Sequence, residues 1–230
     1  MLVEMDAYFY SENYAFSSAE QMAMDEWMLL QTDTLNAIGF RVYHMEETCT
    51  IGRNQRLDSI KERTKDCKVL VRRPTGGGTV FHGTDLIYSL TIPTSHELYD
   101  LKLSELYYEI HTAINRVFKY FSLDAELFDQ CVKRLPDFCF DSPNRFDLLS
   151  LEDGSKLGGS AIKKSKKGIL IQGSLSVDLE SALFAKQFLK EIKETFSLKV
   201  IQKPRENPRM CCHWRDFCKQ FTSDQWNFKL

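Results

Sequence analysis

The chain reads Arg72-Arg73-Pro74-Thr75-Gly76-Gly77-Gly78-Thr79-Val80-Phe81-His82 through its most informative stretch. Each glycine loses backbone freedom on folding, which costs about 0.5–1 kcal/mol relative to alanine in a regular element. A tight hairpin turn, the alternative interpretation, needs only one or two glycines. Exposed amides in such a loop bind anions, and the two arginines add positive charge that pairs with carboxylate or phosphate. The stretch predicts a loop that lies close to an anionic or carboxyl-bearing ligand.

Strands are predicted on both sides of this glycine loop (residues 74–79). Residues 68–71 are apolar and β-branched, which is typical of a buried strand. Residues 86–92, ended by Pro93, have the pattern of the next strand. A Walker loop or a dinucleotide fingerprint would open a helix instead, so neither motif fits.

The rest of the chain alternates predicted strands and helices. Ser17 and Glu20 can cap a helix that runs to about residue 31. Apolar residues at helical spacing predict two further helices, over 101–121 and 179–194. Strands are expected over 39–44, 48–51 and 168–178, a hairpin over 146–151 and 156 onward, and irregular chain over 131–143. The pattern predicts an α/β (α+β) fold, in which residues 1–230 form a single domain with a central mixed β-sheet flanked by helices.

Composition excludes several classes of protein. The chain has 230 residues, of which 43% are hydrophobic and 27% charged, and a formal net charge of −2. A nearly balanced charge gives no indication of nucleic-acid or membrane binding. No apolar run approaches the length of about 20 residues of a membrane helix, and residues 1–6 do not resemble a signal peptide. We therefore expect a cytoplasmic protein.

Seven cysteines, an odd number, show no disulfide-framework spacing, so we expect most of them to be free thiols. Cys211, Cys212 and His213 with Cys218 suggest zinc, but adjacent cysteines lack the two-residue gap of a zinc knuckle. A helix or loop with packed thiols is the preferred interpretation, and no metal site is predicted.

Several motifs together resemble the biotin/lipoate A/B protein ligase superfamily, in the branch of lipoate-protein ligases and cysteine-dependent octanoyltransferases. The resemblance covers roughly residues 15–180 and leaves 205–230 as an extension without a functional account. The blocks that carry it are Met22–Glu26, Thr50–Gln55, Arg72–His82, Cys139–Pro143, Lys156–Ala161 and Gln172–Ser174.

The resemblance implies an enzyme that places a lipoyl or octanoyl group on one lysine of a lipoyl domain. The acceptors would be the E2 subunits of 2-oxoacid dehydrogenases or the glycine-cleavage H protein. In this interpretation Cys139 takes the acyl group from octanoyl acyl carrier protein as a thioester, without a cofactor, and Lys156 contacts the acyl carbonyl and stabilises the thiolate. His82 would donate to the carbonyl or orient the loop. The acyl- or nucleotide-binding residues would be Arg73, Thr75, Gly76, Gly77, Gly78, His82, Gly159, Ser160, Ala161 and Gly173.

Two other functions stay open. The first is an ATP-dependent lipoate-protein ligase, which works through lipoyl-AMP and needs ATP and Mg. The ligase pattern favours asparagine at Phe146, and few residues remain after 178 for the accessory domain of many ligases. The transferases, however, more often have arginine at Gly78. The second is a non-catalytic module that binds lipoyl domains, in which Cys139 is inert packing, Lys156 is solvated and His82 is an ordinary strand residue.

Overall fold

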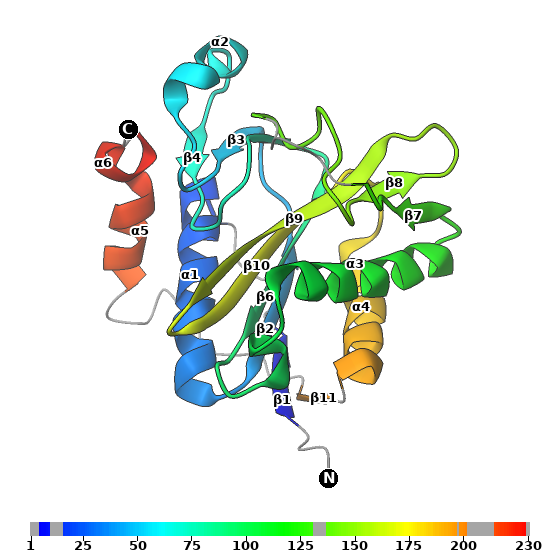
Figure 1. The fold of residues 1–230 in the computed structure, drawn as a ribbon. Helices are drawn as coiled ribbons and strands as arrows, with labels where there is room; N and C mark the ends of the chain where they lie inside the picture. The colour runs from blue at the N-terminus through cyan, green and yellow to red at the C-terminus, as the bar shows by residue number, and fades with distance from the viewer. Residues whose placement is uncertain (1–4, 10–15, 131–136, 197, 202–213, 229–230) are drawn as a thin grey trace.

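The computed structural model describes residues 5–9, 16–130, 137–196, 198–201 and 214–228 (Figure 1). Its larger sheet has eight strands in the order β11-β1-β2-β6-β10-β9-β8-β7. Strands β11, β1 and β2 pair in parallel, and every other neighbouring pair is antiparallel, so the predicted mixed sheet is confirmed. The bounds are β11 (Leu198–Ile201), β1 (Met5–Phe9), β2 (Ile38–Tyr43), β6 (Leu86–Ile92), β10 (Gly168–Leu175), β9 (Lys156–Ser165), β8 (Leu148–Ser150) and β7 (Ala125–Leu127).

A second, three-stranded sheet holds the glycine loop. Its order is β4 (Leu70–Arg72), β3 (Thr48–Ile51) and β5 (Val80–His82). The glycines therefore join β4 to β5, whereas we expected them to lead directly to the strand over 86–92. Strand β5 has only three residues, too few for a period-two pattern to stand out in the sequence. The expectation of one sheet is corrected to two.

Helices cover both faces of the large sheet. Helix α1 (Ser18–Leu35) lies on one face with α5 (Trp214–Thr222) and α6 (Asp224–Asn227) beside it, and α3 (Leu103–Tyr120) and α4 (Ser181–Phe196) lie on the other (Figure 1). The predicted capping box is present, because the Ser17 hydroxyl accepts from the Glu20 amide and the Glu20 carboxylate accepts from the Ser17 amide. Three short elements lie in the connections: η1 (Leu57–Ser59), α2 (Lys61–Thr64) and η2 (Glu97–Tyr99).

Strand β6 shows how the two faces are separated. Leu86, Tyr88 and Leu90 point into the core under α3 and α4, whereas Ile87 points into the core under α1. Complete burial of such a side chain contributes about 1.5–3 kcal/mol. The alternation buries both faces of the strand, so every residue of β6 is buried.

One pair of cysteines forms a disulfide, although the sequence predicted mostly free thiols. Cys49, on β3, and Cys67, which precedes β4, form a disulfide. The odd count and irregular spacing gave no indication of it, because the pair depends on the parallel alignment of β3 with β4. Cys139 is a free thiol, and Cys218 packs beside the core under α1. Cys131, Cys211, Cys212 and His213 lie outside the described residues. Among the helices that the structure describes, none combines the length and the apolar character needed to cross a membrane.

Candidate active site

A cavity of about 400 Å³ lies between the two sheets and contains most of the predicted site. Apolar side chains line the cavity. All but one of the predicted site residues line it as well: Arg73, Gly76, Gly77, Gly78, His82, Cys139, Lys156, Gly159, Ser160, Ala161 and Gly173. Thr75 is the exception. It is fully buried and donates to Gln172 Oε1 at 2.7 Å. This hydrogen bond anchors the loop to β10.

The glycine loop turns its carbonyls toward Arg73. The guanidinium donates to Gly76 O at 2.6 Å and to Gly78 O at 2.7 Å, and it reaches Thr50 O at 3.3 Å. In a trans peptide the C=O and N–H groups point in opposite directions. The amide that follows each bonded carbonyl therefore points away from Arg73. Within the described chain, the amides of residues 76–78 have no hydrogen-bond partner, which leaves them available to a ligand.

Gly77 brings the loop against the predicted nucleophile. Its φ of 88° is one that side-chain-bearing residues rarely adopt. A Cβ placed on Gly77 would lie 2.9 Å from Arg73 Nη2 and 3.8 Å from Cys139 Sγ. Cys139 itself is fixed by its amide, which donates to Thr79 O at 2.9 Å. Cys139 thus lies directly beside the loop backbone.

Arg73 and Arg72 differ from their expected roles. Burial lowers the pKa of the Arg73 guanidinium, while the Cys139 thiol beside it works in the opposite direction. Arg73 therefore holds the loop and lies beside the sulfur, and its donors point to loop carbonyls rather than to a ligand. Arg72 is fully buried and donates to the carbonyls of Gly52 and Gln55, outside the cavity. Only one of the two arginines faces the site, because neighbours on a strand point in opposite directions.

Lys156 forms a buried ion pair. Its Nζ lies 2.5 Å from Asp147 Oδ2, with 5% and 0% of the two side chains exposed, and donates to the Cys139 carbonyl at 2.7 Å. Lys156 therefore orients the Cys139 backbone, and within the described chain its ammonium contacts Asp147, the Cys139 carbonyl and the Phe140 ring rather than the sulfur. Gly159 makes room for this pair, since a Cβ there would lie 2.7 Å from Asp147 Oδ1.

A network of hydrogen bonds extends from Asp147 under the cavity floor. Tyr107 donates to Asp147 and accepts from the Ser160 amide at 2.9 Å. Burial raises the pKa of the Tyr107 hydroxyl well above its usual value, and the Asp147 carboxylate adds to the effect. His111 lies behind Ser160 and is fully buried. Its Nδ1 donates to Phe146 O at 2.7 Å, and its Nε2 is hydrogen-bonded to Ser160 Oγ at 2.6 Å. Burial lowers the pKa of His111 to about 4.

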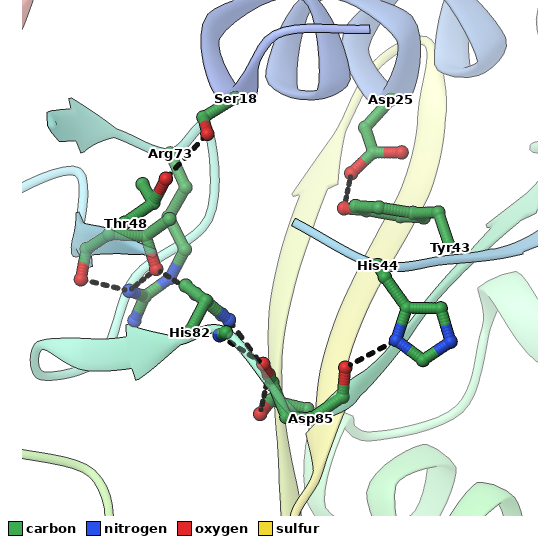
Figure 2. Close-up of polar contacts among 11 residues, drawn as sticks. Ser18, Asp25, Tyr43, His44, Thr48, Arg73, His82 and Asp85 are labelled. Carbon is green, nitrogen blue, oxygen red and sulfur yellow. Dashed lines mark hydrogen bonds and ion pairs between the residues drawn. The ribbon is translucent and has the colours of Figure 1, made fainter. Parts of the chain in front are cut away.

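His82 is held at both ring nitrogens. Figure 2 shows His82 and Asp85 pointing toward one another, with Arg73 close by. Nδ1 lies 2.7 Å from Asp85 Oδ2, and Nε2 lies 2.8 Å from Thr50 Oγ1. Burial disfavours the Asp85 carboxylate, but hydrogen bonds from His82, Ser174 and the Gly83 amide outweigh it and lower the pKa of Asp85. Of the two roles considered for His82, this geometry fits orientation of the loop.

Asp25 supports the site from α1. It accepts from Tyr43 at 2.8 Å and from Gln172 Nε2 at 2.6 Å (Figure 2 shows the first of these). Burial raises the pKa of Asp25, although Arg41 and these hydrogen bonds work in the opposite direction. Since Gln172 also accepts from Thr75, α1 is linked to the glycine loop through β10.

Metal ligands do not gather in this site. In the parts of the chain that the structure describes, no three His, Cys, Asp or Glu side chains form a group able to hold a metal ion. The set considered for zinc lies outside those parts, apart from Cys218.

Sequence reasoning missed Asp147, Tyr107, His111 and Asp85. Asp147 carried a usable signal, since it is a single acidic residue at the start of the apolar run 148–149. Tyr107 and His111 are spaced by four on the predicted helix over 101–121, so they share a face. Nothing in the local sequence indicates that this face points to the motif that contains Lys156.

Similarity to known proteins agrees with this arrangement. The sequence profile described as the lipoyl protein ligase A/B catalytic domain matches residues 17–221. The octanoyltransferase LipM of Geobacillus kaustophilus is 35% identical over 126 residues, which are 51% of this chain and 45% of that protein. LipM of Bacillus cereus is 31% identical over 208 residues, 80% of this chain and 73% of that protein. The chain spans about half the length of LipM from G. kaustophilus and from Macrococcus caseolyticus, at 45% and 52%.

Two solved structures share the fold. A lipoate-protein ligase A with bound ATP superposes with a TM-score of 0.74 at 18% identity, over 98% of this chain and 99% of that chain. The bipartite lipoate protein ligase of Thermoplasma acidophilum, described with its E2 lipoyl domain, gives 0.72 at 16% identity, over 98% and 96%. The predicted fold is confirmed, and at these identities the likeness carries the fold alone.

Proposed function

This chain belongs to the lipoyl protein ligase A/B catalytic domain family, and we propose that it is an octanoyltransferase that acylates the acceptor lysine of lipoyl domains through a Cys139 thioester. The donor is a thioester of a carrier protein, and residues 17–221 act as one catalytic domain. The names of the LipM relatives support the transferase branch.

The reaction has two steps. In the first, the Cys139 thiol gives up its proton and attacks the donor carbonyl, the donor C–S bond breaks, and that proton leaves with the donor thiol. In the second, the neutral amine of the acceptor lysine attacks the acyl-Cys139 carbonyl, the acyl C–S bond breaks as an amide forms, and the proton released by the amine restores the Cys139 thiol. Each step builds negative charge on the carbonyl oxygen, which hydrogen-bond donors can stabilise.

The observation that carries the proposal is the position of the Cys139 sulfur beside Gly77. Gly76, Gly77 and Gly78 line the same cavity as that sulfur, and their amides, which have no hydrogen-bond partner among the described residues, are the donors that we propose for a developing oxyanion. One well-placed donor is worth about 2.7–4 kcal/mol in a dry site. Arg73 supplies a positive charge beside the sulfur, which stabilises negative charge that develops at the reacting atoms.

The cavity suits an acyl chain. Met22, Met45, Ile87 and Ile162 line it together with Cys139, and each buried methylene contributes about 0.8 kcal/mol to binding. Lys156 fixes the Cys139 backbone and is itself held by Asp147. These contacts assign Lys156 and Asp147 to positioning.

The ATP-dependent ligase is the second candidate, favoured by the fold shared with an ATP-bound ligase. A magnesium ion at the phosphates needs oxygen ligands. Asp147 instead accepts from Lys156, Tyr107 and the Asn144 amide, and its neighbour Phe146 offers no side-chain oxygen. The residues around Asp147 do not fit a magnesium ion.

The test is a comparison of donors. The protein is incubated with octanoyl carrier protein, or with lipoate, ATP and magnesium, and an apo lipoyl domain is added. The proposal predicts acyl transfer from the carrier protein without ATP, lost in Cys139→Ser. Lipoylation that requires ATP and survives Cys139→Ser would establish the ligase instead. Stoichiometric binding without turnover under either donor would indicate a binding module.

A further inference from the structure

Arg72 lies between the active-site scaffold and helix α6. Its guanidinium donates through Nη1 to Gly52 O at 2.8 Å and to Gln55 O at 2.8 Å. On the other side, Nε donates to Trp226 O at 3.0 Å and to Asn227 O at 3.2 Å. One fully buried side chain thus joins the loop over residues 52–55 to the end of α6.

The backbone of Arg72 is held by the same two residues of α6. Its amide donates to Asn227 Oδ1 at 2.9 Å, and its carbonyl accepts from Trp226 Nε1 at 2.6 Å. Asn227 is in turn fixed, since its Nδ2 donates to Phe221 O at 2.9 Å. Trp226 and Asn227 therefore hold both the backbone and the side chain of Arg72, in addition to its pairing with Ile51 on β3.

The loop over 52–55 touches the site at two points. Gly52 packs so closely on Gly77 that a Cβ at Gly52 would collide with the Gly77 carbonyl oxygen. The Gln55 side chain accepts from Thr79 Oγ1 at 3.1 Å and donates to Asp137 O at 2.6 Å. Thr79 pairs with residues 137–139, since its amide donates to Asp137 O at 2.7 Å and its carbonyl accepts from the Cys139 amide at 2.9 Å.

The buried charge of Arg72 makes the connection between α6 and the loop over 52–55 rigid. Backbone carbonyls of α6 and of the loop over 52–55 accept from the Arg72 guanidinium, and burial lowers the pKa of Arg72. A buried donor that loses its acceptor costs about 1–3 kcal/mol, more when the donor is charged. Displacement of α6 therefore also displaces Arg72 and the loop over 52–55.

We propose that Trp226 and Asn227 are positioning residues for catalysis, which act through Arg72 and the loop over 52–55 to place Gly77 and Cys139. Residues 214–228, which belong to the extension that the sequence left without a function, thereby become part of the active-site scaffold. The transfer readout below rests on the proposed function, whereas the alkylation readout does not.

The test uses two small changes and a matched control. Trp226→Phe removes the indole donor and keeps an aromatic ring, and Asn227→Ala removes the acceptor of the Arg72 amide. Trp214→Phe is the control, because Trp214 lies in the same helix pair and packs on Phe16. For each protein we measure kcat and KM for octanoyl transfer, the rate of Cys139 alkylation by iodoacetamide from peptide mass, and the thermal midpoint.

We expect Trp226→Phe and Asn227→Ala to lower kcat at least tenfold with KM within twofold, and to slow Cys139 alkylation at least threefold. Trp214→Phe should change both rates less than twofold, even where it lowers the thermal midpoint. The proposal is overturned if the two α6 variants lose thermal stability but keep both rates within twofold of the wild type. If the wild type transfers no octanoyl group, the proposed function fails, and the alkylation rates still decide the positioning role.

Discussion

The sulfur of Cys139 lies 3.8 Å from the point that a Cβ on Gly77 would occupy. This contact joins two motifs that are far apart in the sequence, and it explains the glycine at residue 77 better than a turn does. A side chain there would contact Arg73 and approach the nucleophile. The backbone of the glycine loop therefore lines the cavity beside Cys139.

Substitutions at neighbouring positions of the glycine loop should have very different effects on stability and activity. Gly77→Ala places a side chain at φ 88° and 2.9 Å from Arg73 Nη2. We expect it to destabilise the fold by at least about 1 kcal/mol and to lower octanoyl transfer at least tenfold. Gly76→Ala is the control, because a Cβ there meets nothing within 4 Å. Urea denaturation and transfer rates check both, and equal effects of the two variants would contradict the close contact.

The buried pair of Lys156 and Asp147 should matter for both stability and rate. Asp147→Asn leaves the Lys156 ammonium buried without a counter-charge, and loss of one partner of such a pair costs about 3–5 kcal/mol. We expect a comparable fall in the free energy of unfolding and a large loss of transfer activity. Glu152→Gln, in an exposed turn, should change neither. A variant at Asp147 with wild-type stability would show that the pair is not formed.

Stability should decrease in acid because of His111. The folded pKa is about 4, below the ordinary value of 6.5, so the unfolded chain binds more protons between these values. The free energy of unfolding therefore falls as pH decreases from about 6.5 to about 4, by up to about 3 kcal/mol from this group. His111→Asn, which can still donate to Phe146 O, should remove that part of the slope. Parallel slopes for the two proteins in urea denaturation would refute this assignment.

The disulfide between Cys49 and Cys67 should make stability depend on reductant. It closes a loop with a sequence separation of 18, for which chain entropy predicts about 3 kcal/mol. Reduction of the wild type should lower the free energy of unfolding by about that amount, measured by urea denaturation with and without dithiothreitol. A Cys49→Ser/Cys67→Ser double variant should be insensitive to reductant. If the wild type is equally insensitive, the bond is absent in solution.

Much of the fold could be predicted because its signals are local. The capping box at Ser17, the apolar run of β6 and the helical spacing over 103–120 all depend on near neighbours in the sequence. Strand β5 and the second sheet could not be predicted, since three residues carry no clear period and their pairing with β3 is long-range.

The site was predictable to the extent that its residues lie in motifs. Gly77, Cys139 and Lys156 were all expected and share one cavity. Their electrostatic partners were not, because Asp147 meets Lys156 where β8 pairs with β9, and Tyr107 and His111 meet Asp147 and Ser160 through the packing of α3 on β9. The same limit applies to Arg72, which was expected at the ligand and lies against α6 instead.

The most direct measurement is the intact mass of the protein after incubation with octanoyl carrier protein in the absence of acceptor. The account predicts a gain of one octanoyl group, located at Cys139 by peptide mass, absent in Cys139→Ser and discharged when an apo lipoyl domain is added. Transfer of octanoate to the lipoyl domain by the Cys139→Ser protein at the wild-type rate would contradict it.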